Sequence, residues 1–162
     1  MVMIVHNDAT AFSSSIQAFA KVMTRDKFRL VIRKIGLEAL TRLVRKTPVD
    51  TGRARGNWQV SIGTPNLDYD DEMKDPSGGE AEAGSGGMAP IRAGDAVIKT
   101  APLDSIIWIT NNLPYIQKLD EGGSHQAPTG MVDSTMLELQ TMFERDHQGE
   151  ASDLGGNEEG IG

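Results

Sequence analysis

The chain has 162 residues, a length typical of one domain with short tails. Its formal net charge of -7 argues against a protein that binds nucleic acid regardless of sequence, because such binding depends on basic surfaces. It contains no cysteine, which excludes disulfides, thiolate chemistry and a zinc ribbon. No segment has the roughly 20 apolar residues that cross a bilayer, and MVMIVHNDAT lacks the pattern of a signal peptide. We therefore expect a soluble protein, cytoplasmic in the cell that makes it.

The first part of the chain predicts two helices and a strand. Residues 10–23 are weakly amphipathic, and a stronger helical pattern runs from Asp26 to Lys46. This long helix is expected to end there because Pro48 disfavours helical geometry in the residue before it. The next segment, NWQVSIG at residues 57–63, alternates apolar and polar side chains as a half-buried strand does.

The middle of the chain predicts a loop and two more strands. Residues from about 64 to 95 are rich in Gly, Pro and acidic residues without a sustained period, which is typical of a long mobile loop. AVIKTA at residues 96–101 predicts a short strand. DSIIWIT at residues 104–110 predicts a stronger one, whose continuous apolar run suits a strand covered on both faces.

The last part of the chain predicts two helices. NNLPYIQKLDEGG is expected to form a short helix that Asn111 or Asn112 caps and Gly122 helps to end. Residues 129–147 have a second helical period, and the acidic residues 148–162 predict a disordered tail. The whole order predicts a single α+β domain over residues 1–147. A long N-terminal amphipathic helix would accompany a small antiparallel sheet with the C-terminal helices packed on it.

Charge is unevenly distributed along the sequence. Lysine and arginine gather in the first third, and seven acidic residues lie between Asp68 and Glu82. Two oppositely charged surfaces could join copies of the chain to one another or place it between two partners. They could equally be two solvated faces.

Asp50-Thr51-Gly52, in the stretch TPVDTGRARGNW, spells the catalytic triplet of aspartic proteases. Such enzymes need two loops between apolar strands, so that two carboxylates share one proton. Here a basic helix precedes the triplet, and Arg53 and Arg55 follow it. The alternative is a rigid corner, in which the Asp50 side chain bonds backbone amides and Gly52 supplies a positive φ. That corner would fix where Arg53 and Arg55 point.

The remaining reactive residues do not assemble a catalytic or cofactor site. The three histidines, His6, His125 and His147, are far apart, and His125 is expected at a surface or interface. Asp68, Asp70 and Asp71 could hold a cation such as Ca²⁺, but the glycine and distal glutamate of a helix-loop-helix calcium site are missing. We expect no catalytic residue, metal or cofactor. Apolar side chains expected in the core, or at an interface, are Trp58, Trp108, Met131, Met136 and Met142.

Two stretches resemble the tail-completion proteins of tailed bacteriophages, also called neck or head-to-tail joining proteins. The first is TPVDTGRARGNW after a long amphipathic helix. The second is IWITNNLPYIQKLDEGGSHQAPTGMV, in which an apolar strand leads to Asn-Leu-Pro-Tyr, then to an acidic residue with glycine. The resemblance extends from about Phe28 to Val132, without the Gly-rich loop.

The resemblance implies a structural virion protein, not an enzyme. Such proteins form rings, commonly hexameric, that cap the tail tube at the head-proximal end. The ring docks to the connector on the head, and genomic DNA passes through its axis. Residues that would shape the two corners, as architectural or interface residues, are Asp50, Thr51, Gly52, Arg53, Asn112, Pro114, Tyr115, Glu121 and Gly122.

Other functions stay open on the sequence alone. The chain could be a neighbouring part of the same machine, such as a connector stopper or a tail-tube terminator. It could also be an aspartic protease that uses Asp50, or an adaptor that binds a charged partner through its arginine-rich helix.

Overall fold

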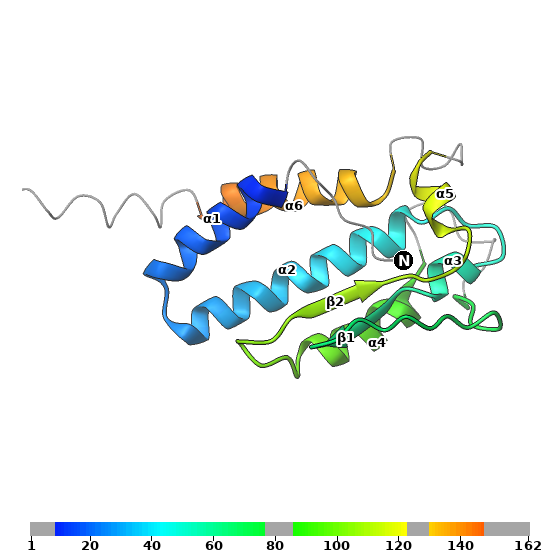
Figure 1. The fold of residues 1–162 in the computed structure, drawn as a ribbon, viewed down its shortest axis with the longest axis horizontal. Helices are drawn as coiled ribbons and strands as arrows, with labels where there is room; N and C mark the ends of the chain where they lie inside the picture. Colours follow the sequence, from blue (N-terminus) through cyan, green and yellow to red (C-terminus); the bar gives the residue numbers. More distant parts are fainter. Residues whose placement is uncertain (1–8, 77–85, 123–129, 148–162) are drawn as a thin grey trace, which may run out of the picture.

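The chain adopts an α+β fold in which helices pack against one face of a two-stranded antiparallel sheet (Figure 1). A computed structural model describes residues 9–76, 86–122 and 130–147. The predictions for His6, His125 and the tail at 148–162 lie outside these residues. In chain order the elements are α1 (Ala9–Val22), α2 (Arg25–Lys46), α3 (Arg53–Gly56), β1 (Gln59–Ile62), α4 (Met88–Ile98), β2 (Ile107–Thr110), α5 (Ile116–Asp120) and α6 (Val132–His147).

Helix α2 is the central element of the fold, as its strong periodicity predicts. It begins after Thr24, whose Oγ1 accepts a hydrogen bond from the Lys27 N–H at 3.3 Å. It ends at Lys46, where Thr47 leaves the helix in an extended conformation before Pro48. The N–H of Thr47 still donates to the carbonyls of Leu43 and Val44, so the last turn closes on a bonded cap.

Two apolar clusters lie on opposite sides of α2. On one side α1 and α6 cover it, and on the other side lie the sheet and α4 (Figure 1). The first cluster joins Leu40, Leu43 and Val44 to Trp58, Ile91, Ile98, Leu113, Ile116 and Met131. The second is built from Phe12, Phe19, Leu139, Met142 and Phe143, with Met136 packed against it. The predicted core positions of Met131, Met136 and Met142 are therefore confirmed.

The sheet has an apolar face turned to the core and a second, mixed face. Its register pairs Gln59 with Thr110 and Ile62 with Ile107. Val60, Ile107 and Ile109 pack against the first cluster. Of the two tryptophans expected in the core, Trp58 is buried, but Trp108 is only half-buried. Trp108 lies opposite Ser61 on the other face, where its indole N–H donates to the Gly63 carbonyl at 2.9 Å.

The predicted loop at 64–95 is wrong in its last part, because residues 88–98 form α4. The predicted strand at 96–101 is wrong throughout, because α4 includes residues 96–98 and a turn follows it. Glycine and proline conceal the helical period there: Ile91, Gly94 and Ile98 are buried at helical spacing. Gly94 allows close packing, since a Cβ there would lie 2.2 Å from Leu40 Cδ2 and 2.7 Å from Val60 Cγ2. Proline is tolerated because Pro90 lies in the first turn.

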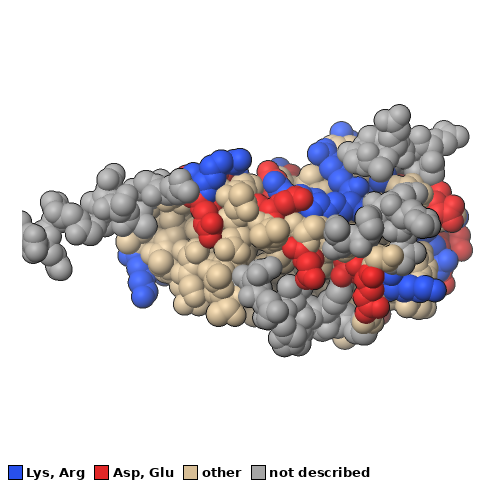
Figure 2. All heavy atoms as spheres, turned by 90° about the horizontal axis from the view of Figure 1, so that it is seen from above, with Lys and Arg blue, Asp and Glu red and all other residues tan. Residues whose placement is uncertain are grey.

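Basic side chains of α2 pair with acidic side chains of α6. Arg42 and Lys46 both bind the Glu138 carboxylate, at 3.1 and 2.6 Å, and Lys34 binds Asp146 at 3.0 Å. Figure 2 shows acidic and basic side chains interspersed over the face that carries α1 and α6. On this face, part of the basic surface of α2 is thus neutralised within the chain.

Asp146 makes the connection between α2 and α6 dependent on pH. Hydrogen bonds from Lys34 and then from Arg145 hold the pKa of Asp146 below its ordinary value of 3.8. The ionised form therefore stabilises the fold above that value, and the contribution is lost as the pH falls through the lowered pKa. We expect Asp146→Asn to lower the melting temperature slightly at pH 7 and to match the parent once both are strongly acidified.

Thermal unfolding across this pH range measures the effect. Glu144→Gln is the control, because Glu144 lies on the same exposed turn and, among the described residues, its carboxylate accepts a bond only from Gln140. A difference in melting temperature between Asp146→Asn and the parent that persists at strongly acidic pH would contradict a stabilising role of the ionised Asp146 carboxylate.

A candidate assembly corner built from the two motifs

The first motif, residues 47–58, is tied together at its ends. The Trp58 indole N–H donates to Thr47 Oγ1 at 2.7 Å, and that hydroxyl donates to the Leu43 carbonyl at 2.7 Å. Both Thr47 and Trp58 are buried. Since an unpaired buried polar group is costly, this chain of bonds fixes the end of α2 against the start of β1. The sequence places these two residues at the motif's limits but does not show that they meet.

The middle of the first motif is the rigid corner that its composition predicts, with one correction. Gly52 has φ 79°, a left-handed conformation that favours glycine, and it directly precedes α3. The backbone N–H of Arg53 donates to Thr51 Oγ1 at 3.4 Å. The expected bonds to the Asp50 carboxylate are absent among the described residues. The Asp50 side chain is exposed instead, because Thr51 takes the bonding role.

Arg53 points from the first motif to the second. Its guanidinium forms an ion pair with Asp71 and lies 5.8 Å from the centre of the Tyr115 ring. A cation over an aromatic face is attracted by the negative potential of the ring. Tyr115 keeps 37% of its surface exposed, so this contact lies at the rim of the molecule.

Asn111 joins the two motifs inside the protein. Its side-chain amide donates to the Ala54 carbonyl at 2.7 Å across a separation of 57 residues. Its Oδ1 accepts from the Leu113 N–H at 3.4 Å. Asn111 does not cap the short helix as predicted, because α5 begins at Ile116, after Tyr115, without a side-chain cap. The two motifs therefore form one structural unit, which we call the corner.

Asn112 and Asn57 hold the segment that follows β1. Asn112 donates to the carbonyls of Asn66 and Asp68 at 2.8 and 3.2 Å, so it does not cap the short helix either. Asn57 is buried, donates to the Asp70 carbonyl at 2.9 Å and accepts from the Asp70 N–H at 2.9 Å. The polar side of β1, which alternation alone would place in water, is thus covered by its own chain.

Arg55, a candidate corner or interface residue from the sequence, lies in the interior. It is fully buried, and its Nη1 lies 3.5 Å from Asp75 Oδ2. Asp75 is 3% exposed and also accepts the Gly87 N–H at 2.9 Å. Arg55 therefore closes the base of the long segment between β1 and α4. The sequence does not predict this pairing, because Asp75 is one of many acidic residues in its segment.

The remaining predicted corner residues lie around the second motif. Pro114 and Glu121 are exposed, and the Glu121 carboxylate accepts from the Gln117 amide at 2.8 Å. Gly122 has φ 87° after α5. Asp120, which no sequence motif singles out, accepts the N–H groups of Met131 and Val132 at its Oδ1, at 2.7 and 2.9 Å. It thereby caps α6 from a distance.

No known family model, curated protein or solved structure matches the chain. The motifs and their geometry therefore carry the functional argument.

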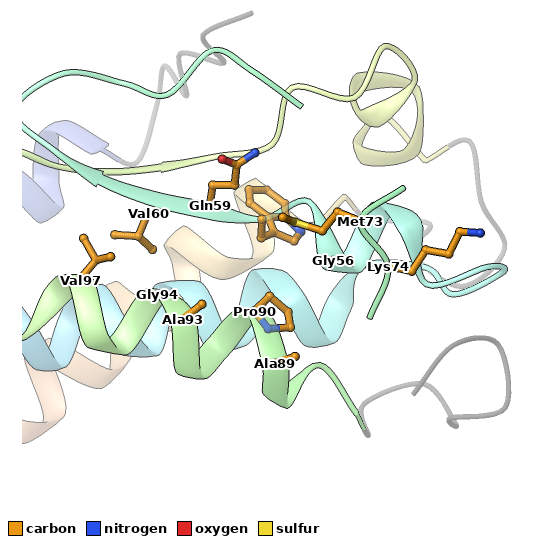
Figure 3. A pocket seen from close by; sticks show the side chains of 11 residues that line it. Gly56, Gln59, Val60, Met73, Lys74, Ala89, Pro90, Ala93, Gly94 and Val97 are labelled. Carbon is orange, nitrogen blue, oxygen red and sulfur yellow. The ribbon is translucent and has the colours of Figure 1, made fainter. Parts of the chain in front are cut away.

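An apolar groove runs beside β1, between that strand and α4 (Figure 3). Its volume is about 350 Å³. Val60 of β1 and Val97 of α4 face each other across one end of it, while the Lys74 side chain points away. The walls are formed by Gly56, Trp58, Gln59, Val60, Met73, Lys74, Ala89, Pro90, Ala93, Gly94 and Val97.

Acidic and histidine side chains do not gather into a metal site within residues 9–76, 86–122 and 130–147. Of the carboxylates that the sequence offers as calcium ligands, that of Asp70 accepts the Glu72 N–H at 2.8 Å and that of Asp71 pairs with Arg53. In the same ranges no helix has both the length and the apolar composition to cross a membrane.

Proposed function

We propose that the chain is a structural virion protein of a tailed bacteriophage, and that it forms a ring at the junction of head and tail. The observation that supports this most is the contact between the two motifs. Stretches that separately resemble the tail-completion family meet through the Asn111–Ala54 bond and the Arg53–Tyr115 contact. A two-part resemblance that converges on one corner fits a shared structural feature better than chance similarity.

The chemistry of the corner favours an architectural role. Its buried polar side chains, Thr47, Asn57 and Asn111, are engaged in hydrogen bonds that hold backbone segments together. Its exposed side chains, which include Asp50, Pro114 and Tyr115, are left to meet a neighbour. We therefore assign no catalytic residue and no cofactor.

The proposed ring, a hexamer by resemblance, would join two different machines. One side would dock to the connector or head-closure protein, and the other to the tail tube or its terminator. Genomic DNA would pass through the axis without sequence-specific binding. The net charge of -7 suits such a passage, because an acidic protein does not retain DNA. The protein would then reside in the virion, after assembly in the host cytoplasm.

Cryo-electron microscopy of the intact particle, or of the purified chain at high concentration, tests the proposal. We expect a closed ring at the head–tail junction, with the corner in contact with neighbouring subunits. A strictly monomeric chain that remains so with its partners present would sink the proposal. A ring located inside the connector, or on the tail tube below it, would favour a stopper or a terminator.

Tyr115→Ala tests the corner itself. Tyr115 is partly exposed and its cation–π contact contributes only about 0.5–1 kcal/mol at such a site, so the monomer should keep its stability. We expect ring formation to be lost, as measured by light scattering behind size-exclusion chromatography. Tyr69→Ala is the matched control, because Tyr69 is 45% exposed and lies outside both motifs. Equal effects of the two variants would contradict an interface at the corner.

The protease alternative rests on Asp50 alone. Its carboxylate is exposed in a turn after a helix, whereas the aspartic-protease mechanism needs two carboxylates that share a proton. A proteolytic activity that Asp50→Asn abolishes would restore that alternative.

A further inference from the structure

The outer edge of β1 carries backbone groups that make no hydrogen bond to any other described residue. The Gly63 N–H donates to the Ile106 carbonyl at 2.8 Å, which continues the ladder one pair beyond Ile62. Bonded and non-bonded pairs alternate in an antiparallel ladder, so the next bonded pair toward the strand's start is Ser61 with its partner. The N–H and C=O groups of Val60 and Ile62 therefore point away from β2.

The outer edge of β2 is unpaired for the same reason. Ile107 and Ile109 stand opposite Ile62 and Val60, so their backbone groups point away from β1. Within the described residues, no backbone or side-chain group bonds to the outward N–H and C=O groups at either edge. Each copy of the chain thus offers one free donor–acceptor edge on β1 and another on β2.

The two edges match in their side chains as well as in their backbones. The residues with outward backbone groups are the ones whose side chains face the apolar side of the sheet, where Val60, Ile107 and Ile109 contact the core. If β1 of one copy paired with β2 of another, apolar side chains would therefore stand opposite apolar side chains. A shift by one residue would break this match.

The groove gives the incoming strand room. It lies along β1 on the side of α4, and the α4 side chains in it, such as Ala93, are small (Figure 3). Its volume of about 350 Å³ is large enough for isoleucine side chains. Ile107 and Ile109 are only half-buried within their own copy, so part of each remains to be covered by a neighbour.

We propose that β1 of one copy pairs in antiparallel fashion with β2 of the next, and that a second copy fills the groove. This inference rests on the ring proposed above and adds a second subunit contact to the one proposed at the corner. Rotational symmetry keeps all β1 strands in one direction and all β2 strands in the other, so antiparallel pairing continues around the ring. Closure leaves no strand edge exposed, which also stabilises a sheet that has only two strands in each copy.

Cross-linking tests the contact directly, because the chain contains no cysteine. Ile62→Cys is mixed with Ile107→Cys in one sample and with Ile109→Cys in another, and both samples are oxidised. We expect a disulfide-linked dimer in at least one mixture and none from any variant alone, because only neighbouring strands bring the two sulfur atoms within bonding distance. Leu137→Cys, on the exposed surface of α6, is the control. It replaces Ile62→Cys in each mixture and should not form a cross-linked dimer.

A proline at position 62 tests whether the outward backbone N–H group contributes to pairing between copies. Ile62→Pro removes an outward N–H and leaves the bonds between β1 and β2 intact, as proline does at edge strands. We expect Ile62→Ala to form rings and Ile62→Pro to stay monomeric with a similar melting temperature. Ser61→Pro removes an N–H inside the ladder, so we expect it to lower the melting temperature clearly.

The outcomes separate this inference from the proposed function. A ring at the head–tail junction without either cross-link, or a ring formed by Ile62→Pro, overturns strand pairing and leaves the function standing. A cross-linked ring that is absent from the junction supports strand pairing and overturns the function. A chain that stays monomeric at millimolar concentration, and forms no ring in a particle, overturns both.

Discussion

Arg55→Met is expected to lower the free energy of unfolding by about 3–5 kcal/mol, the usual cost of leaving one member of a buried ion pair uncompensated. Methionine keeps much of the apolar volume of arginine, so the main loss is the positive charge beside Asp75. Both side chains are almost completely withdrawn from water. Urea denaturation at neutral pH measures the change.

Two further variants separate charge from packing. Asp75→Asn in the Arg55→Met background removes the stranded charge and keeps an acceptor for the Gly87 N–H, so it should recover most of the loss. Arg53→Met is the control, because its pair with Asp71 is partly exposed and such pairs contribute about 0–1 kcal/mol. If the double variant is as unstable as Arg55→Met, charge burial is not the cause.

The second large effect concerns two glycines in helices, whose replacement by alanine should change the stability of the protein in opposite directions. Gly94→Ala should destabilise the protein by about 1–3 kcal/mol, the usual range for overpacking, because its Cβ would overlap Leu40 and Val60. Gly36→Ala in α2 should stabilise it by up to about 1 kcal/mol through helix propensity. The atom nearest to a Cβ at position 36 is Ile98 Cδ1, at 3.6 Å, an ordinary contact distance.

Thermal and urea unfolding of Gly94→Ala and Gly36→Ala measure these two stability changes. A stabilised Gly94→Ala protein would show that α4 can move away from α2 and β1. That result would also weaken the groove as a fixed surface, since the groove lies between α4 and β1.

Local periodicity was sufficient to predict the elements whose residues carry a strong pattern. α2 has a long apolar stripe, β1 alternates, and β2 is a continuous apolar run, so all three appear within a few residues of their predicted limits. α4 was missed because Gly87, Pro90 and Gly94 are read locally as loop residues. Its stability comes from close contact with Leu40 and Val60, which a local pattern does not contain.

Local sequence patterns also predict part of the corner. Gly52 and its positive φ follow from local turn chemistry. The buried roles of Arg55 and Asn111 do not, because their partners are 20 and 57 residues away. An arginine in a polar stretch is normally exposed, and only the tertiary fold brings a carboxylate to its interior position.

The hydrogen bond between Asp75 and Gly87 has a practical consequence for testing the proposed ring. The donor and the acceptor are 2.9 Å apart, so this bond holds the two ends of the chain between them next to each other. Lengthening a closed loop is entropically cheap, about 0.6 kcal/mol for each doubling. An epitope or fluorescent label inserted there should therefore leave the fold intact and report where each copy stands.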